Sequence, residues 1–209
     1  MTLRLPDTGA DVLPDGRRMV PSADRNSAPI LEVLQGLGLT GRLLEIASGA
    51  GLHAARMAAP LGLIWQPTDV DPANFASIRA WSATSAVAIL PPVLLDATQP
   101  GWAGTTGRWD AILLVNLLHL IPAAAVESLL AELAHALAPQ GTACLYGPFL
   151  RDGQPTSPGD AAFDASLRAQ DPAIGYKDLA WVTGLLSAAG LVVDVVPMPA
   201  NNLMLIARH

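Results

Sequence analysis

The segment LLEIASGAGLHAA, residues 43–55, is the part of the sequence whose residue types point most directly to ligand binding. An apolar run leads into a loop of small residues, and small residues let the backbone approach a ligand closely. In a doubly wound α/β sheet, the loop after the first strand is a common ligand-binding position. A dinucleotide loop needs the pattern G-x-G-x-x-G, but the residue three positions after Gly51 is Ala54. The loop therefore favours a ligand other than a dinucleotide.

Two aspartates end the next two strands that the sequence predicts. Asp69 ends residues 63–69, and a carboxylate in this place can accept hydrogen bonds from both hydroxyls of a ribose. Asp96 ends residues 93–96, where it can contact a ligand or begin a turn. Asp71 is better explained as the N-cap of the following helix. Asp69 thus predicts a nucleoside-containing ligand without saying which one.

Histidines supply the candidate proton-transfer groups. His119 follows Asn116 at the end of a continuous apolar segment, and a neutral imidazole there can take a proton from a hydroxyl, thiol or amine. The alternative for His119 is a histidine that bonds locally at a helix start. His53 follows the glycine loop and is a candidate substrate contact. The four histidines lack the spacing of metal ligands, so we expect no metal site.

Strand-like and helix-like segments alternate along the chain and must position these residues. We expect strands at 42–47, 63–69, 93–96, 109–116, 142–147, 191–196 and 203–208, and helices at 28–37, 52–59, 71–83, 122–137 and 176–189. Such alternation predicts a mostly parallel sheet with helices on both faces. Only the six residues PMPANN separate the last two strands, and a parallel crossover needs about a dozen. The predicted fold is therefore α/β and Rossmann-like, with seven strands and an antiparallel C-terminal hairpin.

The domain organisation follows from the same segments. A chain of 209 residues suits one α/β domain, and we assign it to residues 27–209. Residues 1–26 are rich in Pro, Gly and Asp and lack periodicity, so they are interpreted as an N-terminal arm. Residues 148–175 hold one short helical piece among Gly, Pro, Ser and Asp, and are interpreted as a lid or substrate loop.

Composition excludes several classes of partner. The net charge is −6 and the 12 basic residues are scattered, so no basic stripe for nucleic acid is present. No run of 18 apolar residues occurs and the N-terminus lacks a signal-peptide layout, so we expect no membrane span and a cytoplasmic protein. Cys144 is the only cysteine, which excludes an internal disulfide. A mean hydropathy of +0.38 favours an exposed apolar patch and a possible homodimer.

Taken together, these residues resemble class I S-adenosylmethionine-dependent methyltransferases. The first motif of those enzymes is an acidic residue followed by alternating glycines, which here reads Glu45-x-Ala47-x-Gly49-x-Gly51. From Ser22 onward, nearly the whole chain resembles an uncharacterised family of small methyltransferase-like proteins. The segments that carry this resemblance are SADRNSAPILEVL, LLEIASGAGLHA, WQPTDVD, SIRAW, NLLHLIP, YGPF, FDASLR and MPANNL.

The resemblance implies S-adenosylmethionine as the cofactor and a methyl transfer to a small, partly apolar acceptor. The residues it implies for the cofactor are Asn26, Glu45, Ala47, Ser48, Gly49, Gly51, Asp69, Val70, Asp96, Ala97 and Asn116. His119 or Tyr146 is expected to orient or deprotonate the acceptor, and Arg25, His53 and Asn201 are expected to contact it. Two alternatives stay open. One is a binding protein or partner subunit that holds S-adenosylmethionine without turnover, and the other, less favoured, is a nicotinamide oxidoreductase.

Overall fold

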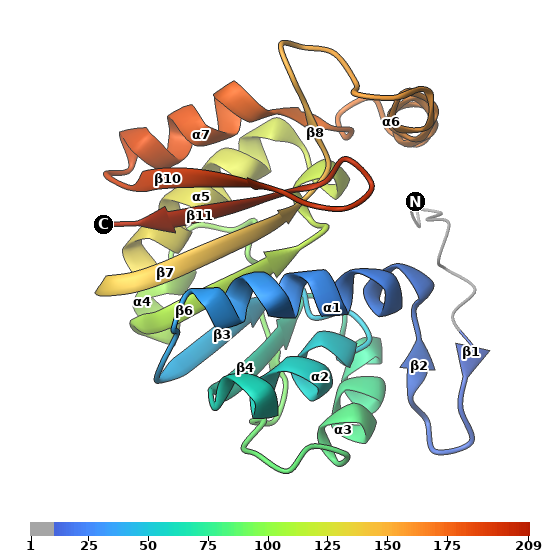
Figure 1. Ribbon diagram of the computed structural model, residues 1–209, viewed down its shortest axis with the longest axis vertical. Helices are drawn as coiled ribbons and strands as arrows, with labels where there is room; N and C mark the ends of the chain where they lie inside the picture. Colours follow the sequence, from blue (N-terminus) through green and yellow to red (C-terminus); the bar gives the residue numbers. More distant parts are fainter. Residues whose placement is uncertain (1–10) are drawn as a thin grey trace. The chain divides into compact units, whose positions relative to one another are not determined.

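The computed structural model describes residues 11–209, and its largest element is a seven-stranded sheet (Figure 1). The strand order is β10-β11-β7-β6-β3-β4-β5. Their bounds are Arg42–Ile46 (β3), Ile64–Asp69 (β4), Val93–Leu94 (β5), Trp109–Val115 (β6), Leu137–Gly147 (β7), Val192–Pro197 (β10) and Leu203–Arg208 (β11). β4 is parallel to β3 and to β5, whereas β11 is antiparallel to both β10 and β7. The predicted seven-stranded fold with an antiparallel C-terminal hairpin is confirmed.

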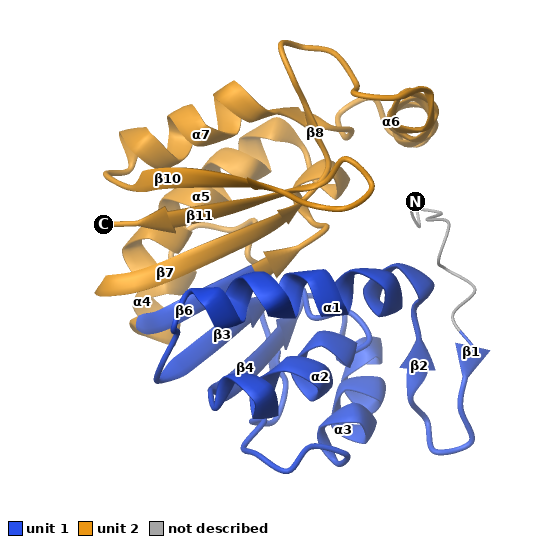
Figure 2. Ribbon diagram, viewed as in Figure 1, with its two compact units in different colours: residues 1–96, 109–113 blue, residues 97–108, 114–209 orange. Residues whose placement is uncertain are grey.

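The first compact unit comprises the described residues up to Asp96 together with Trp109–Leu113 (Figure 2). Its helices are Pro21–Gly36 (α1), Leu52–Leu61 (α2) and Phe75–Ser82 (α3), with a short 3-10 turn at Pro72–Asn74 and a hairpin of Asp11–Val12 (β1) and Arg18–Met19 (β2). α2 packs against both α1 and α3, and also against β4. The core between them is fully buried and includes Ile30, Leu44, Met57 and Trp65.

The second unit comprises Ala97–Arg108 and Leu114–His209. Its helices are Trp102–Thr106 (α4), Ala123–Ala136 (α5), Pro158–Gln170 (α6) and Leu179–Ala188 (α7), with a 3-10 turn at Leu118–Leu120 and a small parallel sheet of Phe149–Leu150 (β8) and Lys177–Asp178 (β9). α5 packs against α4, α7 and β7, and α7 packs against β10. The apolar face that the sequence predicts for α5, with Val126, Leu129 and Leu133, is buried.

Several element boundaries differ from the predicted ones. The first helix starts at Pro21 and not at residue 28, and it contains Pro29 in its interior. Proline suits the first turn of a helix because its missing N–H has no partner there anyway, so the Pro21-Ser22 sequence is a helix start. Arg25 and Asn26 therefore belong to α1 and not to a loose arm, whereas residues 1–10 of the predicted arm lie outside the described residues. β7 begins at Leu137, five residues before the strand predicted at 142–147.

Residues 148–175, predicted as a lid and called the lid segment below, are more ordered than their composition indicates. α6 begins at Pro158, five residues before the predicted helical piece, because Ser157 is its N-cap and accepts a hydrogen bond from the Asp160 N–H. Proline at the first helical position and a serine cap are both typical of helix starts. α4 was not predicted at all.

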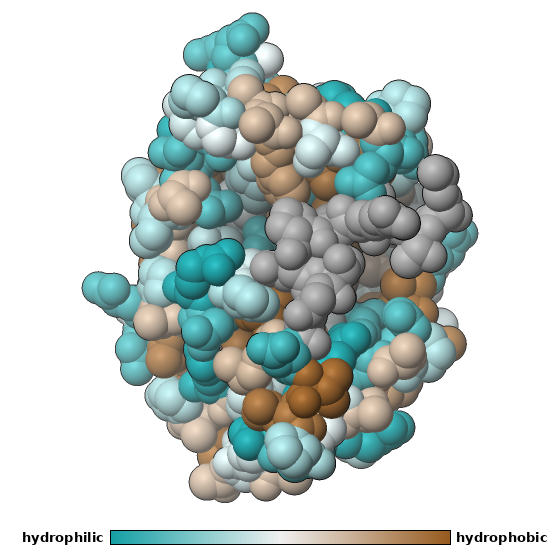
Figure 3. Space-filling model, turned by 90° about the vertical axis from the view of Figure 1, so that its right-hand side faces the viewer, coloured by the Kyte–Doolittle hydropathy of each residue, from teal (hydrophilic) through white to brown (hydrophobic). Residues whose placement is uncertain are grey.

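Apolar side chains reach the surface in groups. Figure 3 shows a face on which hydrophilic and hydrophobic residues are interspersed, with strongly hydrophobic atoms gathered in its lower half. Within the first unit, the exposed large aliphatic residues include Ile64, Val70, Val93 and Leu94, at β4 and at the edge strand β5. The hydropathy of the chain predicts such exposure.

Candidate functional site: a left-handed glycine loop and a buried histidine cluster

Every second residue of the glycine loop in the first unit, from Ala47 to Gly51, adopts a left-handed backbone conformation. Ala47, Gly49 and Gly51 have φ values of 56°, 55° and 89°. This region costs an L-residue about 1–2 kcal/mol relative to ordinary helix geometry, so glycine is the usual residue and Ala47 is strained. An alanine held in this conformation indicates that the surrounding hydrogen bonds fix the loop.

Those hydrogen bonds come from the end of β4. The Ser48 N–H donates to the Thr68 carbonyl at 2.8 Å, and the Thr68 N–H donates to the Ser48 hydroxyl at 3.1 Å. Asp69 accepts from the Gly49 N–H at 2.8 Å and from the Asp71 N–H at 2.9 Å, one with each carboxylate oxygen. A carboxylate oxygen has more than one acceptor position. Asp69 therefore anchors the loop and keeps acceptor capacity for a ligand.

Two of the loop glycines differ in what surrounds them. A Cβ atom on Gly51 would lie 2.7 Å from the Cα of Ile78 on α3, which backbone atoms cannot accommodate. A Cβ on Gly49 would meet no atom of the described residues within 4 Å. Gly51 is thus required by packing, while the space over Gly49 is open.

The carboxyl ends of β4 and β5 carry three of the predicted cofactor residues. Asp69 is buried, the next side chain, Val70, is 58% exposed, and Asp96 is exposed two residues beyond the end of β5. The Leu95 N–H donates to the Asp69 carbonyl at 3.0 Å, which joins the two strand ends. An anchored carboxylate beside an exposed apolar side chain suits the ribose and the ring of a nucleoside.

Glu45, His53 and Asn26 form a buried polar chain within the first unit. Glu45 is 1% exposed and accepts a hydrogen bond from the Trp65 indole N–H at 2.9 Å. Its other oxygen lies 3.7 Å from His53 Nδ1, and His53 Nε2 lies 2.8 Å from Asn26 Oδ1. Burial raises the pKa of Glu45 to about 7 and lowers the pKa of His53 to about 4. One oxygen of Glu45 thus bonds to Trp65 and the other lies near His53.

In the second unit, Asn116 and Tyr146 lie at the ends of two strands. Asn116 directly follows β6, has a φ of 57° and donates its N–H to the Tyr146 carbonyl at 2.8 Å. Asn is one of the few residues that adopt this conformation readily. Tyr146 is buried on β7, and burial raises the pKa of its phenol. Tyr146 is therefore a neutral hydroxyl at ordinary pH.

His119 is held by aromatic rings. Its imidazole makes edge contacts with Phe163 of α6 and with Tyr176, at ring-centre distances of 5.8 and 5.9 Å. Burial, together with the nearby charge of Lys177, lowers the pKa of His119 to about 3. Among the described residues, no side chain forms a hydrogen bond with the ring nitrogens. His119 is thus a neutral imidazole that is fixed by packing and free to bond a ligand.

The segment after α6 contributes residues that sequence reasoning missed. Lys177, the only lysine, is buried and donates from Nζ to the Gly175 carbonyl at 2.8 Å, and the Gly175 N–H donates to the His119 carbonyl at 3.0 Å. Burial lowers the pKa of Lys177 to about 8. Asp164 of α6 accepts from the Tyr176 N–H at 2.6 Å. The only signal in the sequence that could have pointed to Lys177 is that it is the single lysine of the chain.

The remaining predicted contacts have other neighbours. Asn201, in the β10–β11 turn with a φ of 60°, donates from Nδ2 to Asp160 of α6 at 3.1 Å, so its side chain ties the lid segment to the hairpin. Ala97 is buried, and its carbonyl accepts from the Trp102 indole. Arg25 is an exposed residue on α1.

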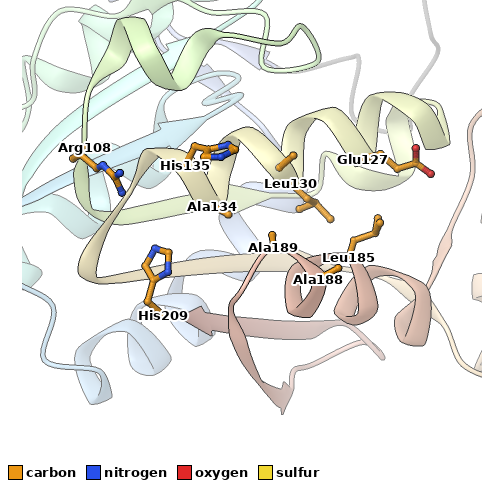
Figure 4. A pocket seen from close by; sticks show the side chains of 10 residues that line it. Arg108, Glu127, Leu130, Ala134, His135, Leu185, Ala188, Ala189 and His209 are labelled. Carbon is orange, nitrogen blue, oxygen red and sulfur yellow. The ribbon is translucent and has the colours of Figure 1, made fainter.

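Grooves on the second unit lie away from the predicted residues. The larger, of about 580 Å³, is lined by α5, α7 and the end of β11 and contains Arg108, His135 and His209 (Figure 4). Another, of about 440 Å³, lies beside Arg151 and Thr183. None of the predicted site residues lines either groove. Over residues 11–209, no cluster of three His, Cys, Asp or Glu side chains could hold a metal, and no helix is long and apolar enough to cross a membrane.

Comparison with known proteins assigns the chain to a family. Residues 17–209 match the family described as "Protein of unknown function (DUF938)". The chain belongs to the DUF938 family. This match covers the glycine loop, both histidines of interest and the lid, and it confirms the predicted membership of a family without an assigned reaction.

Solved structures give the fold of this DUF938 protein a wider context. An O-methyltransferase family protein from Burkholderia thailandensis superposes with a TM-score of 0.77 at 19% identity, covering 90% of this chain and 57% of that one. Human N-acetylserotonin methyltransferase, solved in complex with SAM, gives 0.73 at 17% identity, with 90% and 52% covered. CalO1, a methyltransferase of calicheamicin biosynthesis in its SAH-bound form, gives 0.71 at 16% identity, with 90% and 55% covered. The chain thus spans little more than half of each neighbour and shares its Rossmann-like fold.

Proposed function

We propose that this DUF938 protein is an S-adenosylmethionine-dependent methyltransferase that acts on a small, partly apolar acceptor. The observation that carries the proposal is the left-handed loop Ala47–Gly51, which the Asp69 carboxylate anchors through the Gly49 N–H at 2.8 Å. The same fold occurs in structures solved with SAM and with SAH. A nicotinamide dinucleotide fits less well because the third glycine of its loop is replaced by Ala54.

The residues of the first unit fit this cofactor. The open space over Gly49 allows close approach of a ligand to the loop backbone. Asp69 would bond the ribose hydroxyls, Val70 would pack against the adenine, and Asp96 would accept from the adenine amino group. Within residues 11–209 no side chain caps the N-terminus of α2, which leaves backbone N–H donors for the amino-acid part. When bound, the cofactor supplies a methyl group that is already activated by its sulfonium.

The residues of the second unit supply what an acceptor needs. Because the methyl group is already activated, the protein mainly has to align the acceptor and hold its proton. The neutral imidazole of His119 can accept that proton in a hydrogen bond, and the Tyr146 hydroxyl can orient the acceptor atom. The ring contacts of His119 with Phe163 and Tyr176 favour an acceptor with an apolar part. Arg25 is proposed to contact the acceptor as well.

Calorimetric titration tests the cofactor. S-adenosylmethionine and S-adenosylhomocysteine are titrated into the wild type, into Asp69→Asn, and into Asp71→Asn. Asp71 is a matched control because it is exposed and lies two residues from Asp69, and its carboxylate accepts only from the Ala73 N–H among the described residues. We expect micromolar binding to the wild type and to Asp71→Asn, and at least a tenfold weaker binding to Asp69→Asn. Absence of binding to the wild type would overturn the assignment.

Methyl transfer itself is tested with a labelled methyl donor and a panel of small phenols, thiols and amines. Labelled product that disappears in His119→Phe and in Tyr146→Phe supports the proposed roles. Cofactor binding without product over the whole panel would instead favour the alternative, a binding protein or partner subunit that does not turn over. The predicted homodimer is tested on the same samples by sedimentation.

A further inference from the structure

The buried chain Trp65–Glu45–His53–Asn26 joins four elements of the first unit. The residues come from β4, β3, α2 and α1 respectively. Glu45, His53 and Asn26 are all less than 8% exposed. Burial of three polar side chains is costly unless they satisfy one another. An arrangement of this kind needs a reason beyond stability, because apolar residues of similar volume would fill the same space.

The contact between Asn26 and His53 determines which end of the Asn26 amide is free. Asn26 Oδ1 is an acceptor and lies 2.8 Å from His53 Nε2, so Nε2 must carry the proton of the neutral imidazole. The other ring nitrogen then faces Glu45 Oε1 at 3.7 Å without a proton. This tautomer agrees with a protonated Glu45, since an ionised carboxylate would attract the proton to Nδ1. Asn26 is left with its NH₂ group, which has no partner among the described residues.

The free NH₂ group of Asn26 is a hydrogen-bond donor that His53 links to the N-terminus of α2. His53 is the second residue of α2 and ties the Asn26 side chain to the first turn of this helix. Among the described residues no side chain caps the N-terminus of α2, and the first N–H groups of a helix have no partner within it. A site made of donors at a helix N-terminus favours an anion. The anion on the proposed cofactor is the carboxylate of its amino-acid part.

We propose that His53 and Glu45 are positioning residues that hold the Asn26 amide so that its NH₂ group binds the carboxylate of the cofactor. This inference rests on the proposed function and replaces the expectation that Glu45 meets the cofactor and that His53 meets the acceptor. Glu45 in its protonated form leaves the proton on Nε2 of His53, and Trp65 holds Glu45 in place.

Two ligands separate this role from a general loss of the pocket. S-adenosylhomocysteine carries the amino-acid carboxylate, whereas 5′-methylthioadenosine has the same nucleoside and sulfur but no amino-acid part. We expect His53→Phe and Asn26→Ala to weaken S-adenosylhomocysteine binding by about tenfold or more, the worth of a hydrogen bond to a charged group. Binding of 5′-methylthioadenosine should change by less than about twofold. His53→Gln keeps an N–H donor and should recover part of the affinity.

Controls keep the two proposals distinguishable. His135→Phe removes an exposed histidine of the second unit and should leave both affinities unchanged. If the wild type binds neither ligand, the proposed function fails. If the wild type binds both and His53→Phe binds S-adenosylhomocysteine normally, or loses both ligands equally while still folded, the positioning role fails and the proposed function stands.

The tautomer is measured directly on ligand-free protein by nitrogen NMR of the imidazoles. The charged groups that face the chain are Asp69, near Glu45, and Arg56, near His53 and itself paired with Asp24. We expect His53 to carry its proton on Nε2 below about pH 7 and to shift toward Nδ1 as Glu45 ionises. In Glu45→Gln the Nε2 proton should persist to higher pH. A His53 that is Nδ1-protonated at pH 6 would overturn the assignment of the free amide.

Discussion

The glycine loop of the first unit and the His119 cluster of the second unit both use buried polar groups, but they satisfy them differently. In the loop, Ser48 and Asp69 bond to backbone groups within 3.1 Å and hold strained residues in place. In the cluster, His119 is fixed by ring edges, and its nitrogens bond to no described side chain. Hydrogen bonds to the backbone fix the shape of the loop, whereas an imidazole that bonds to no described side chain remains able to bond a ligand. The first suits binding and the second suits chemistry.

A substitution that disturbs the packing of the glycine loop should give the largest loss of unfolding free energy. Gly51→Ala places a Cβ 2.7 Å from the Ile78 Cα at a φ of 89°, and strain plus overlap should cost about 3 kcal/mol of unfolding free energy. Gly49→Ala is the matched control, because it has the same left-handed strain with open space around it and should cost about 1 kcal/mol. Urea denaturation measures both. Equal losses in the two variants would mean that contact with α3 does not shape the loop.

The corresponding glycine in the second unit is Gly175. Its φ is 129°, and a Cβ there would lie 2.6 Å from Asp164 Oδ1 and 2.7 Å from the Arg168 Cζ of α6. Those atoms end flexible side chains that can move, so Gly175→Ala should cost about 2 kcal/mol through backbone strain. The damage should stay local and appear as faster hydrogen exchange in α6. Unchanged exchange in α6 would show that this helix is not held through Gly175.

Acid should reveal the difference between the two regions. The pKa of His119 is about 3 in the folded protein and 6.5 when unfolded, so unfolding takes up a proton between these values and His119 costs stability as the pH falls through this range. His119→Phe keeps a ring and removes the proton site. Its unfolding free energy relative to wild type should rise by about 1 kcal/mol on going from pH 7 to 5.5. A difference that does not change with pH would contradict a neutral buried imidazole.

Glu45 and His53 should show no such slope as a pair. The folded pKa of Glu45 is raised to about 7, so its contribution to stability falls as pH rises from 4.5 to 7. The folded pKa of His53 is lowered to about 4, so its contribution rises with pH from 4 to 6.5. The two slopes cancel over most of this range. Burial alone therefore does not set the response to acid. The opposite pKa shifts of Glu45 and His53 cancel, whereas the shift of His119 has no such counterpart.

The sequence predicted only part of the structure around the glycine loop and the His119 cluster. Apolar runs and the short PMPANN connection were enough for the sheet and its antiparallel end, because strand length and crossover length are local properties. Glu45, Asp69, Asn116 and His119 were proposed as site residues because each follows or lies in a predicted strand.

The sequence could not predict which side chains contact one another across different elements. The Glu45–Trp65 and Asn26–His53 contacts join residues 20 and 27 positions apart on different elements, and a single sequence gives no distances between elements. Lys177 and Tyr176 reach His119 only because α6 and the following segment fold back to it. The start of α1 was missed because proline, serine and aspartate are as typical of loops as of a helix beginning.

The smallest expected effect concerns the tie between α6 and the last hairpin. Asn201 donates to Asp160 from a left-handed position, so Asn201→Gly keeps the backbone conformation and removes only that hydrogen bond. Because the pair is exposed, the loss should be about 0.5 kcal/mol. Asn201→Ala adds strain and should lose about 1 kcal/mol more. If Asn201 instead contacts the acceptor, Asn201→Gly should lower labelled-methyl transfer with no change in stability, and the two measurements together decide between a tie and a substrate contact.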